Sequence, residues 1–446
     1  MKLKMMSVLL SVAATFTGWA IPEIRQGSVS MVQDASRKIT ITYTLDTAPA
    51  VVTVDILTNG VPLTGAMLQG QLTGAINRKV QPGTHTISWR PRADERIAKM
   101  RNWAEDAEVV VTAWPTNAPP TWMVVDLTKE DSVEFYPDES WFPEPMTNRI
   151  YKTDKLVMRK IPAANVIWRL GSYYYGVISG VSYGEYGRQG HESIRPVMLT
   201  EDYYIGVFEV TQAQYANMKA LPTQTWTDDP TRPVGNVRWK NEIRCTGNIH
   251  YFWPRDGHAV SPTSFMGLLR SHACGIQFDL PTEAQWEIAC RAGEMAAFNN
   301  GCVMYTNVVL VNEVAWTANN AAEGYDEPCS HPVGLKKPNR WGLYDMHGNA
   351  VEYCLDLCPS TSPGNLSEEA AAAHVAYVTN KDLVIDPVGP QDASDGSTNG
   401  GERSIGKGGS YQLTPNYARA AYRYNPYRWS VGQQNGFRLC APASIP

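Results

Sequence analysis

The sequence predicts two domains of different class, an N-terminal all-β sandwich and a C-terminal α+β domain rich in loops. The chain has 446 residues, more than one ordinary hydrophobic core needs. Residues 21–127 alternate apolar and polar side chains, as half-buried strands do. From about residue 153 the regular segments become short, and Gly, Pro, Asn and Trp dominate the loops between them. A hydrophobic content of 43% with 19% charged residues is typical of a folded chain.

Residues 1–20, MKLKMMSVLLSVAATFTGWA, have the composition of a secretory signal peptide. Two early lysines precede an apolar run that ends at Phe16, and small residues follow at the expected cleavage position. The run is too short to span a bilayer well, and no later segment has a charge-free run of spanning length. We therefore expect an exported protein, periplasmic, secreted or on the cell surface, without a transmembrane anchor.

The β-sandwich is expected over residues 21–127. Its strands are KITITYTL, AVVTVDIL, THTISWRP and AEVVVTAW, which are rich in Val, Ile and Thr with period-2 alternation. Turn signals such as Thr58-Asn59-Gly60 and Gln81-Pro82-Gly83 separate them. Several short strands in about 100 residues are typical of immunoglobulin-like or fibronectin-like sandwiches. The segment holds no catalytic constellation, which favours a spacer or docking module.

Residues 128–152 are rich in acids and prolines and lack periodicity, so they predict a linker before a second domain over residues 153–446. Two helix starts stand out in that domain. Thr211 with Gln214, and Thr282 with Gln285, have the spacing of capping boxes. The stretch SEEAAAAHVAYV, residues 367–378, predicts either a third helix or an insertion.

Charge and motif content exclude several function classes. The net charge is −5 and no Lys/Arg run occurs, so a nucleic-acid partner is not expected. The phosphate-binding, GxSxG and HExxH patterns are absent, and His331 and His347 are expected to be satisfied loop residues that could meet. In an exported protein the even number of cysteines makes disulfides plausible, whereas the lack of a CxxC pair argues against zinc. The eight are Cys245, Cys274, Cys290, Cys302, Cys329, Cys354, Cys358 and Cys440.

An ordered series of motifs runs through residues 153–446. It comprises IPAANVIWRLGS, DYYIGVFEVTQAQYANM, RPVGNVRW, FDLPTEAQWEIACRAG, HPVGLKKPNRWGLYDMHGNAVEYCLD, GKGGSY and NGFRLCAP. The series resembles the formylglycine-generating enzyme family, also called the sulfatase-modifying factor family. The resemblance implies a C-type-lectin-like domain with little regular secondary structure. It also implies an oxidase that converts a sulfatase cysteine to formylglycine with copper(I) and O2.

Two cysteines that hold copper in the family follow the Gly-Gly-Ser element. Laid on that motif without gaps, their positions fall on Leu413 and Ala418, which cannot ligate copper. The glycine turn, Ser410, Tyr417 and Arg419 remain, so the stretch keeps the outline of the family's active-site wall without its reactive atoms. We therefore expect no copper site.

The stretch YDMHGNAVEY carries the oxygen donors of a predicted calcium site. Asp345 and Glu352 are hard carboxylate donors, and Gly348 and Ala350 offer carbonyls from the turn between them. The resemblance implies a structural calcium at these four positions, although Val351 stands where family members usually have Trp. The alternative is that both carboxylates only bind backbone groups. The resemblance further implies a structural disulfide between Cys290 and Cys440.

Three functions follow from this comparison. The first is an exported non-oxidase member of the family that binds a peptide, a sulfatase or another protein, or a glycan. The second is an active oxidoreductase with other chemistry or a displaced thiol pair, and the third is an adhesion or structural surface protein. Arg419 and Arg423 could instead pair internally with Glu283 or Glu287. The expected ligand cleft comprises Ser410, Tyr411, Tyr417, Arg419, Arg423 and Arg428.

Overall fold

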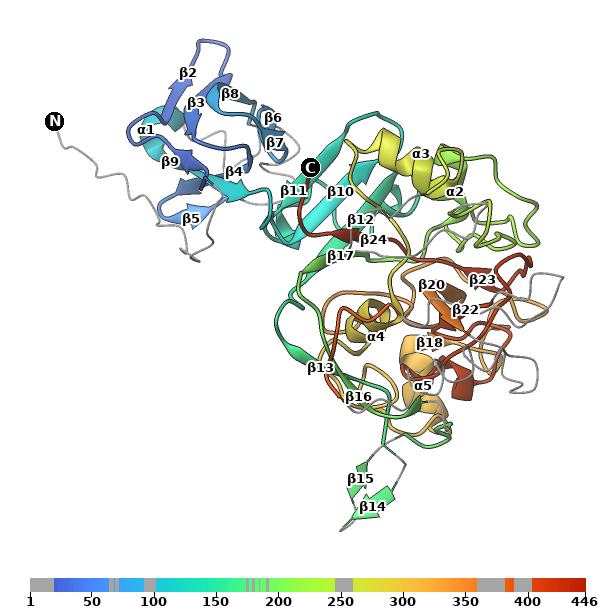
Figure 1. Ribbon diagram of the computed structural model, residues 1–446. Helices are drawn as coiled ribbons and strands as arrows, with labels where there is room; N and C mark the ends of the chain where they lie inside the picture. Colours follow the sequence, from blue (N-terminus) through green and yellow to red (C-terminus); the bar gives the residue numbers. More distant parts are fainter. Residues whose placement is uncertain are drawn as a thin grey trace. The chain divides into compact units, whose positions relative to one another are not determined.

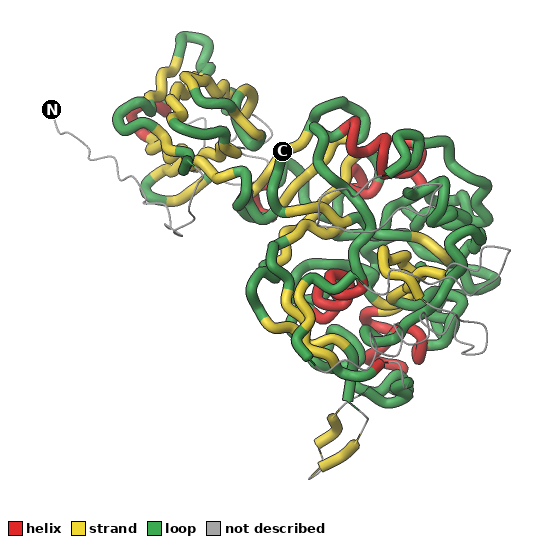
Figure 2. Tube along the Cα trace, viewed as in Figure 1, coloured by secondary structure: helices red, strands yellow, loops and turns green. Residues whose placement is uncertain are grey.

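The computed structural model is mostly β and loop-rich, with few helices (Figures 1 and 2). It describes residues 20–63, 68, 72–91, 102–173, 176–178, 181–183, 185–189, 192–244, 260–358, 382–388 and 403–446. The expected signal peptide, apart from Ala20, and the stretch 367–378 lie outside these residues. Within the described residues, no helix combines the length and apolar character needed to cross a membrane.

The chain divides into two compact units. The first comprises Met1–Met123, Val133–Asn148 and Ser444–Pro446, and the second comprises Val124–Ser132 and Arg149–Ala443. The expected linker, residues 128–152, contains strand β11 (Val133–Tyr136) and two short 3₁₀ helices, η3 (Glu139–Trp141) and η4 (Arg149–Lys152). The boundary between the units falls inside β10 (Trp122–Asp126).

The first unit contains two sheets. One has the order β1-β3-β8-β6 with β2 also on β3, and the other has the order β5-β4-β7 with β9 also on β4. Their bounds are β1 Glu23–Ile24, β2 Ser30–Gln33, β3 Ile39–Asp46, β4 Ala50–Thr58, β5 Val61–Pro62, β6 Leu72–Gly74, β7 Lys79–Val80, β8 Gly83–Trp89 and β9 Ala107–Pro115, with a one-turn helix α1 at Trp103–Asp106. The four quoted strand segments are thus confirmed as β3, β4, β8 and β9.

Alternation along these strands builds the first core. Ile39, Ile41 and Tyr43 of β3 are buried and belong to the same apolar cluster as Val52 and Val54 of β4. Each side chain of this kind stabilises the fold by roughly 1.5–3 kcal/mol through burial. The Asn59-Gly60 turn joins β4 to β5 with φ of 53° and 76°, the left-handed conformations that a tight hairpin needs.

The second unit is built from many short elements joined by loops (Figure 2). In this unit β17 pairs with β12 and with β24. Three-stranded sheets have the orders β13-β16-β21 and β22-β20-β23, beside the pairs β14-β15 and β18-β19. Their bounds are β12 Lys155–Ile161, β13 Ile167–Leu170, β14 Gly176–Ile178, β15 Val181–Tyr183, β16 Arg195–Met198, β17 Tyr203–Gly206, β18 Ala315–Trp316, β19 His347–Gly348, β20 Val351–Cys358, β21 Val384–Ile385, β22 Arg403–Lys407, β23 Asn435–Gly436 and β24 Cys440–Pro442.

Both predicted capping boxes are confirmed. Thr211 caps α2 (Gln212–Met218) with Gln214, and Thr282 caps α4 (Glu283–Arg291) with Gln285. The other helices are α3 (Phe265–His272), α5 (Val308–Val314) and the 3₁₀ helix η7 (Pro415–Ala418). Every residue of α4 is buried, its two glutamates included. This helix therefore forms the centre of the second unit, around which the candidate site is arranged.

Candidate functional site

The expected active-site wall begins at a glycine turn directly after β22. Gly408 and Gly409 have φ of 87° and 73°, and a Cβ on Gly409 would lie 2.8 Å from the Tyr417 carbonyl oxygen. Only glycine permits this close approach of the chain to η7. The Gly408 carbonyl then accepts a hydrogen bond from the Gly348 N–H at 2.7 Å, and the Tyr411 N–H donates to Asn349 at 3.0 Å. The wall is thus packed against the β19–β20 turn.

Ser410 and Tyr411 are fully buried in the wall. The Ser410 hydroxyl donates to Gln434 Oε1 at 2.7 Å, and the Gln412 amide donates to the Tyr411 hydroxyl at 3.2 Å. Burial raises the pKa of Tyr411 above its ordinary value, so this phenol stays protonated. Both side chains are therefore held by neighbouring protein groups.

The two positions that would carry copper-binding thiols hold hydrocarbon. Ala418 is 1% exposed and lies in an apolar cluster with Phe298, Val311 and Cys302. Its carbonyl accepts a hydrogen bond from His347 Nδ1 at 2.7 Å. Leu413 is half-buried and its carbonyl accepts from the Ala318 N–H at 2.9 Å. Apolar packing thus occupies the place of the second thiol.

Cys302 is a thiol that packs in the same cluster as Ala418. Its Sγ donates to the Met304 carbonyl at 3.2 Å, and burial raises its pKa above the ordinary value. A neutral, hydrogen-bonded thiol is a poor nucleophile.

The sequence led us to expect Arg419 in an open ligand cleft, but the structure places it in the interior. Its guanidinium is completely buried and bonds Glu192 at 2.6 Å and Glu185 at 3.0 Å. Both acids precede β16, in a segment whose sequence carries no periodic signal. Sequence reasoning missed them because only the tertiary fold brings that segment to the wall.

Arg423 is also turned inward, as the alternative interpretation of the sequence allowed. Its guanidinium donates hydrogen bonds to both carboxylate oxygens of Glu283, and the distance from Nη2 to Oε2 is 3.1 Å. Arg195 bonds the same carboxylate at 2.5 Å, and Lys407 lies 3.7 Å from it. Burial by itself would raise the pKa of Glu283, but these cations outweigh burial and hold that pKa well below its ordinary value.

These contacts form one buried ion network. Lys407 bonds Glu287 at 3.0 Å, and Arg291 joins Glu287 to Glu185, each at 2.9 Å. The network comprises Glu185, Glu192, Arg195, Glu283, Glu287, Arg291, Lys407, Arg419 and Arg423. It connects α4, β16, β22 and the residues after η7, so charge pairing fixes the back of the wall.

Two expected cleft residues remain. Arg428 is 1% exposed, with its guanidinium 3.7 Å from the Trp239 ring centre, so it too lies inside. Tyr417 is half-buried and packs edge-on against Tyr422 at 5.0 Å. Of the six expected cleft residues, Tyr417 alone keeps an accessible side chain among the described parts of the chain.

The predicted calcium residues lie together around β19 and β20, but they fit the ion only in part. Asp345 Oδ2 accepts from the Gly334 N–H at 2.6 Å, while its buried Oδ1 has no hydrogen-bond partner. Both Glu352 oxygens are already used, by Arg438 at 2.8 Å and by Trp286 Nε1 at 2.6 Å. An unpartnered buried oxygen fits a cation, whereas a carboxylate paired with arginine does not.

Glu209 is a further acid beside this turn that sequence reasoning missed. Its carboxylate accepts from the Ala350 N–H at 2.8 Å and from the Asn349 side chain at 2.6 Å. Burial and then the neighbouring Asp345 raise the pKa of Glu209 well above its ordinary value. Burial likewise raises the pKa of Asp345 to about 6. In the described residues, no group of three His, Cys, Asp or Glu side chains has the arrangement of a metal site.

The expected disulfide between Cys290 and Cys440 does not form in the structure, where both are free thiols. Cys440 Sγ contacts Gln285 Oε1 at 3.7 Å, whereas Cys290 Sγ contacts His347 Nε2 at 3.6 Å. Gln285 and Cys290 are five residues apart on α4, about 140° around the helix axis. The two thiols therefore lie against different faces of the helix.

His331 and His347 do not meet as a pair. His347 accepts from the Asn299 N–H at 3.0 Å and donates to Ala418, and burial lowers its pKa to about 4. His331 stacks on Trp316 with ring centres 3.6 Å apart. Both are satisfied structural residues, as expected from sequence.

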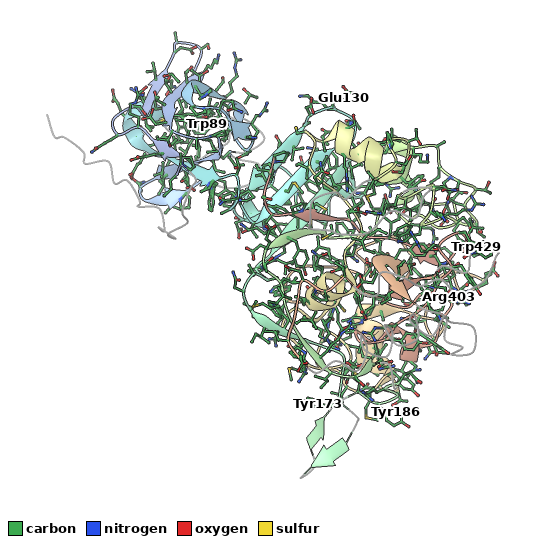
Figure 3. All side chains as sticks on the ribbon, viewed as in Figure 1. Trp89, Glu130, Tyr173, Tyr186, Arg403 and Trp429 are labelled. Carbon is green, nitrogen blue, oxygen red and sulfur yellow. The ribbon has the colours of Figure 1, made fainter. Side chains whose placement is uncertain are left out.

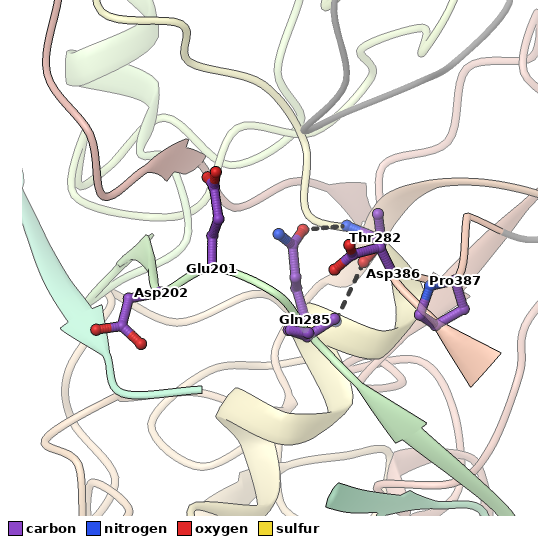
Figure 4. A pocket seen from close by; sticks show the side chains of 7 residues that line it. Glu201, Asp202, Thr282, Gln285, Asp386 and Pro387 are labelled. Carbon is purple, nitrogen blue, oxygen red and sulfur yellow. Dashed lines mark hydrogen bonds between the residues drawn. The ribbon is translucent and has the colours of Figure 1, made fainter. Parts of the chain in front are cut away.

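A pocket at the start of α4 was not foreseen. It is lined by Leu199, Glu201, Asp202, Thr282, Gln285, Asp386 and Pro387 (Figure 4). Asp386 accepts from the Thr200 N–H at 2.8 Å and from the Thr200 hydroxyl at 2.7 Å, so it fastens β21 to the residues before β17. Its carboxylate thus has a structural task.

Comparison with known proteins agrees with the motif series. The family model described as sulfatase-modifying factor enzyme 1-like domain matches residues 163–443. The chaperone protein LppX of Paenibacillus barcinonensis is 29% identical over 179 residues, covering 34% of this chain and 61% of its own. Formylglycine-generating enzyme of Thermomonospora curvata is 26% identical over 234 residues, covering 49% of this chain and 59% of its own. The chain thus spans about three fifths of each of these relatives.

A search of solved structures finds Treponema denticola variable protein 1, with 20% identity, a TM-score of 0.42 and coverage of 65% of this chain and 95% of that chain. PvdO from Pseudomonas aeruginosa has 18% identity, a TM-score of 0.42 and coverage of 64% and 94%. The family match extends over more than half of the sequence. The chain therefore belongs to the sulfatase-modifying factor family, whose domain it carries at residues 163–443.

Proposed function

We propose that this chain is an exported, non-oxidase member of the family that acts by binding a polypeptide. The observation that carries the proposal is the composition of the wall, where Leu413 and Ala418 stand at the two thiol positions. Copper(I) chemistry needs soft thiolate ligands close together. Ala418 is sealed in apolar packing, and the thiol beside it, Cys302, is neutral and hydrogen-bonded. This wall supports shape recognition and no electron transfer.

A polypeptide is the favoured partner among the expected classes of peptide, sulfatase and glycan. One relative is named a chaperone and another a formylglycine-generating enzyme, and both names belong to proteins that handle other proteins. The accessible part of the wall is Tyr417 with the neighbouring Gln412 and Leu413. A tyrosine ring, an amide and an aliphatic side chain suit contact with a peptide better than contact with a highly charged ligand.

The test incubates the secreted protein with copper(I), O2 and a fluorescent peptide carrying the sulfatase cysteine motif. We expect the peptide mass to stay unchanged while fluorescence anisotropy reports saturable binding. Tyr417→Ala should weaken that binding about tenfold, since a stacked aromatic contact is removed. Conversion of the peptide to formylglycine would establish the active-oxidase alternative, and absence of binding would favour the structural or adhesion alternative.

Calcium is proposed at the β19–β20 turn with Asp345 as its carboxylate ligand. The support is the unpartnered, buried Oδ1 of Asp345, which is surrounded by the carboxylates Glu209 and Glu352 as well as by the cations Arg438 and Lys152. Added calcium should raise the melting temperature of the wild type by mass action on the folded state. Asp345→Asn should abolish the shift, whereas Asp386→Asn, a matched change at a satisfied carboxylate, should keep it. An unchanged melting temperature in the wild type would reject calcium here.

A further inference from the structure

The C-terminal part of the chain has an excess of positive charge with a specific distribution. From Arg403 to Pro446 the sequence has six basic residues and no Asp or Glu. Four of them bind buried acids of other segments: Lys407, Arg419, Arg423 and Arg438. Arg428 is buried against Trp239. Within the described residues Arg403 contacts an aromatic ring and a main-chain carbonyl, and no carboxylate.

Arg403 forms one end of an aromatic platform, which comprises Arg403, Tyr427 and Trp429. The Arg403 guanidinium lies 3.6 Å from the Tyr427 ring centre and donates to the Asn425 carbonyl at 2.8 Å. The Tyr427 and Trp429 rings are 5.2 Å apart and inclined by 37°. Trp429 is 49% exposed and is the one tryptophan among the exposed large hydrophobic side chains of the described residues (Figure 3).

The loop that carries the platform is firmly attached. The Lys240 N–H donates to the Arg428 carbonyl at 2.9 Å, and the Asn236 N–H donates to the Gly432 carbonyl at 3.0 Å. Between these bonds the buried Arg428 side chain packs on Trp239. The exposed ring of Trp429 is therefore presented on a fixed backbone, which lowers the entropy cost of binding to it.

The strand beneath the platform offers no free edge to an extended peptide. β22 pairs with β20 along one edge. Along its other edge, the Gly406 N–H donates to the Tyr424 carbonyl at 2.7 Å and the Ser404 N–H donates to the Pro426 carbonyl at 3.1 Å. Because the main-chain groups of β22 are hydrogen-bonded on both edges, an extended peptide cannot pair with this strand. Recognition must come from the flat rings and the single cation.

We propose that the platform binds an anionic glycan. The apolar face of a pyranose ring stacks on Trp429, and a carboxylate or sulfate substituent of the sugar receives hydrogen bonds from the Arg403 guanidinium. The guanidinium is held over the Tyr427 ring and by its hydrogen bond to the Asn425 carbonyl, so the plane of this cation is fixed before a ligand arrives. This site is separate from Tyr417 and does not depend on the proposed peptide binding.

Isothermal titration of the full secreted protein tests the site with three probes: a heparin-derived hexasaccharide, a hyaluronan hexasaccharide and uncharged maltohexaose. We expect the two anionic sugars to bind, and maltohexaose to bind at least about tenfold more weakly. Trp429→Ala should weaken the anionic sugars about tenfold, and Arg403→Gln should remove the preference for charge.

Tyr173→Ala is the matched control. Tyr173 is 55% exposed, and its ring lies 5.1 Å from the Arg169 guanidinium (Figure 3). The substitution therefore removes another exposed aromatic ring beside an arginine. The affinity of the Tyr173→Ala variant for the sugars should equal that of the wild type. The proposal is overturned if no sugar binds, if Trp429→Ala and Tyr173→Ala behave alike, or if a poly-glutamate peptide binds through Trp429 while the sugars do not. Loss of peptide binding in Tyr417→Ala with intact sugar binding separates this site from the proposed function.

Discussion

Replacement of Glu283 by glutamine is expected to lower the free energy of unfolding by about 3–5 kcal/mol, because it leaves buried cations uncompensated. The Glu283 carboxylate is completely buried and binds Arg423 and, at 2.5 Å, Arg195, with Lys407 at 3.7 Å. Glutamine has nearly the same shape, so the change removes charge and little packing. Denaturant unfolding followed by circular dichroism measures the loss.

Glu294→Gln is the matched control at the surface. Glu294 pairs with Arg340 at 2.6 Å, but that arginine side chain is 73% exposed. An exposed pair of this kind contributes about 0–1 kcal/mol, since water screens both charges. A similar loss in the two variants would contradict the structural role assigned to the buried ion network.

The same substitution changes the pH dependence of stability. The cations around Glu283 hold its folded-state pKa well below the ordinary value despite its burial. Such a group contributes stability above the unfolded pKa, and that contribution is lost as the pH falls toward the folded pKa. We expect the wild type to lose more stability than Glu283→Gln when the pH drops below about 4. Parallel curves for the two proteins would be inconsistent with this charge state.

Gly348→Ala is expected to have the second large effect, and to act at the turn that holds the wall. A Cβ on Gly348 would lie 2.0 Å from the Trp316 carbonyl oxygen, and the residue has a φ of 76°. The left-handed backbone costs alanine about 1–2 kcal/mol. Overpacking against rigid backbone adds about 1–3 kcal/mol or more. Thermal unfolding should show a large fall in melting temperature.

Gly293→Ala separates the cost of the left-handed backbone from the cost of overpacking. Gly293 has a φ of 89°, and a Cβ there would meet nothing within 4 Å. It should therefore show the backbone term alone, about 1–2 kcal/mol. If Gly293→Ala costs as much as Gly348→Ala, the close approach of the turn to Trp316 is not what requires glycine.

Elements that are specified by residues close together in the sequence could be predicted for this protein. Val, Ile and Thr in 39–46 and 50–58 specify β3 and β4 as strands. Alternation marks the buried face at the start of β3, since successive side chains point to opposite faces, whereas Ala50–Val54 of β4 are buried on both faces. Thr282 and Gln285 fix the start of α4 because the cap spans three residues. The assignment of Leu413 and Ala418 to the two thiol positions rests on their fixed spacing after the Gly-Gly-Ser element and stays a prediction.

Partners distant in sequence were not predictable. The expectation that Arg419 faces a ligand fails because Glu185 and Glu192 reach it from more than 200 residues away. The expected Cys290–Cys440 bond fails because α4 places the two thiols against different faces. The segment that carries Glu185 and Glu192 has no periodicity that marks those acids as buried.

The sequence by itself determined the family and the β-rich, loop-rich character of the chain, because both depend on short spacings along the chain. The tertiary structure alone decided which charges pair with each other in the interior, as Arg419 does with Glu185 and Glu192. The physical reason is that the value of an ionic contact depends on burial and on the approach of segments far apart in sequence, and both exist only in the folded state.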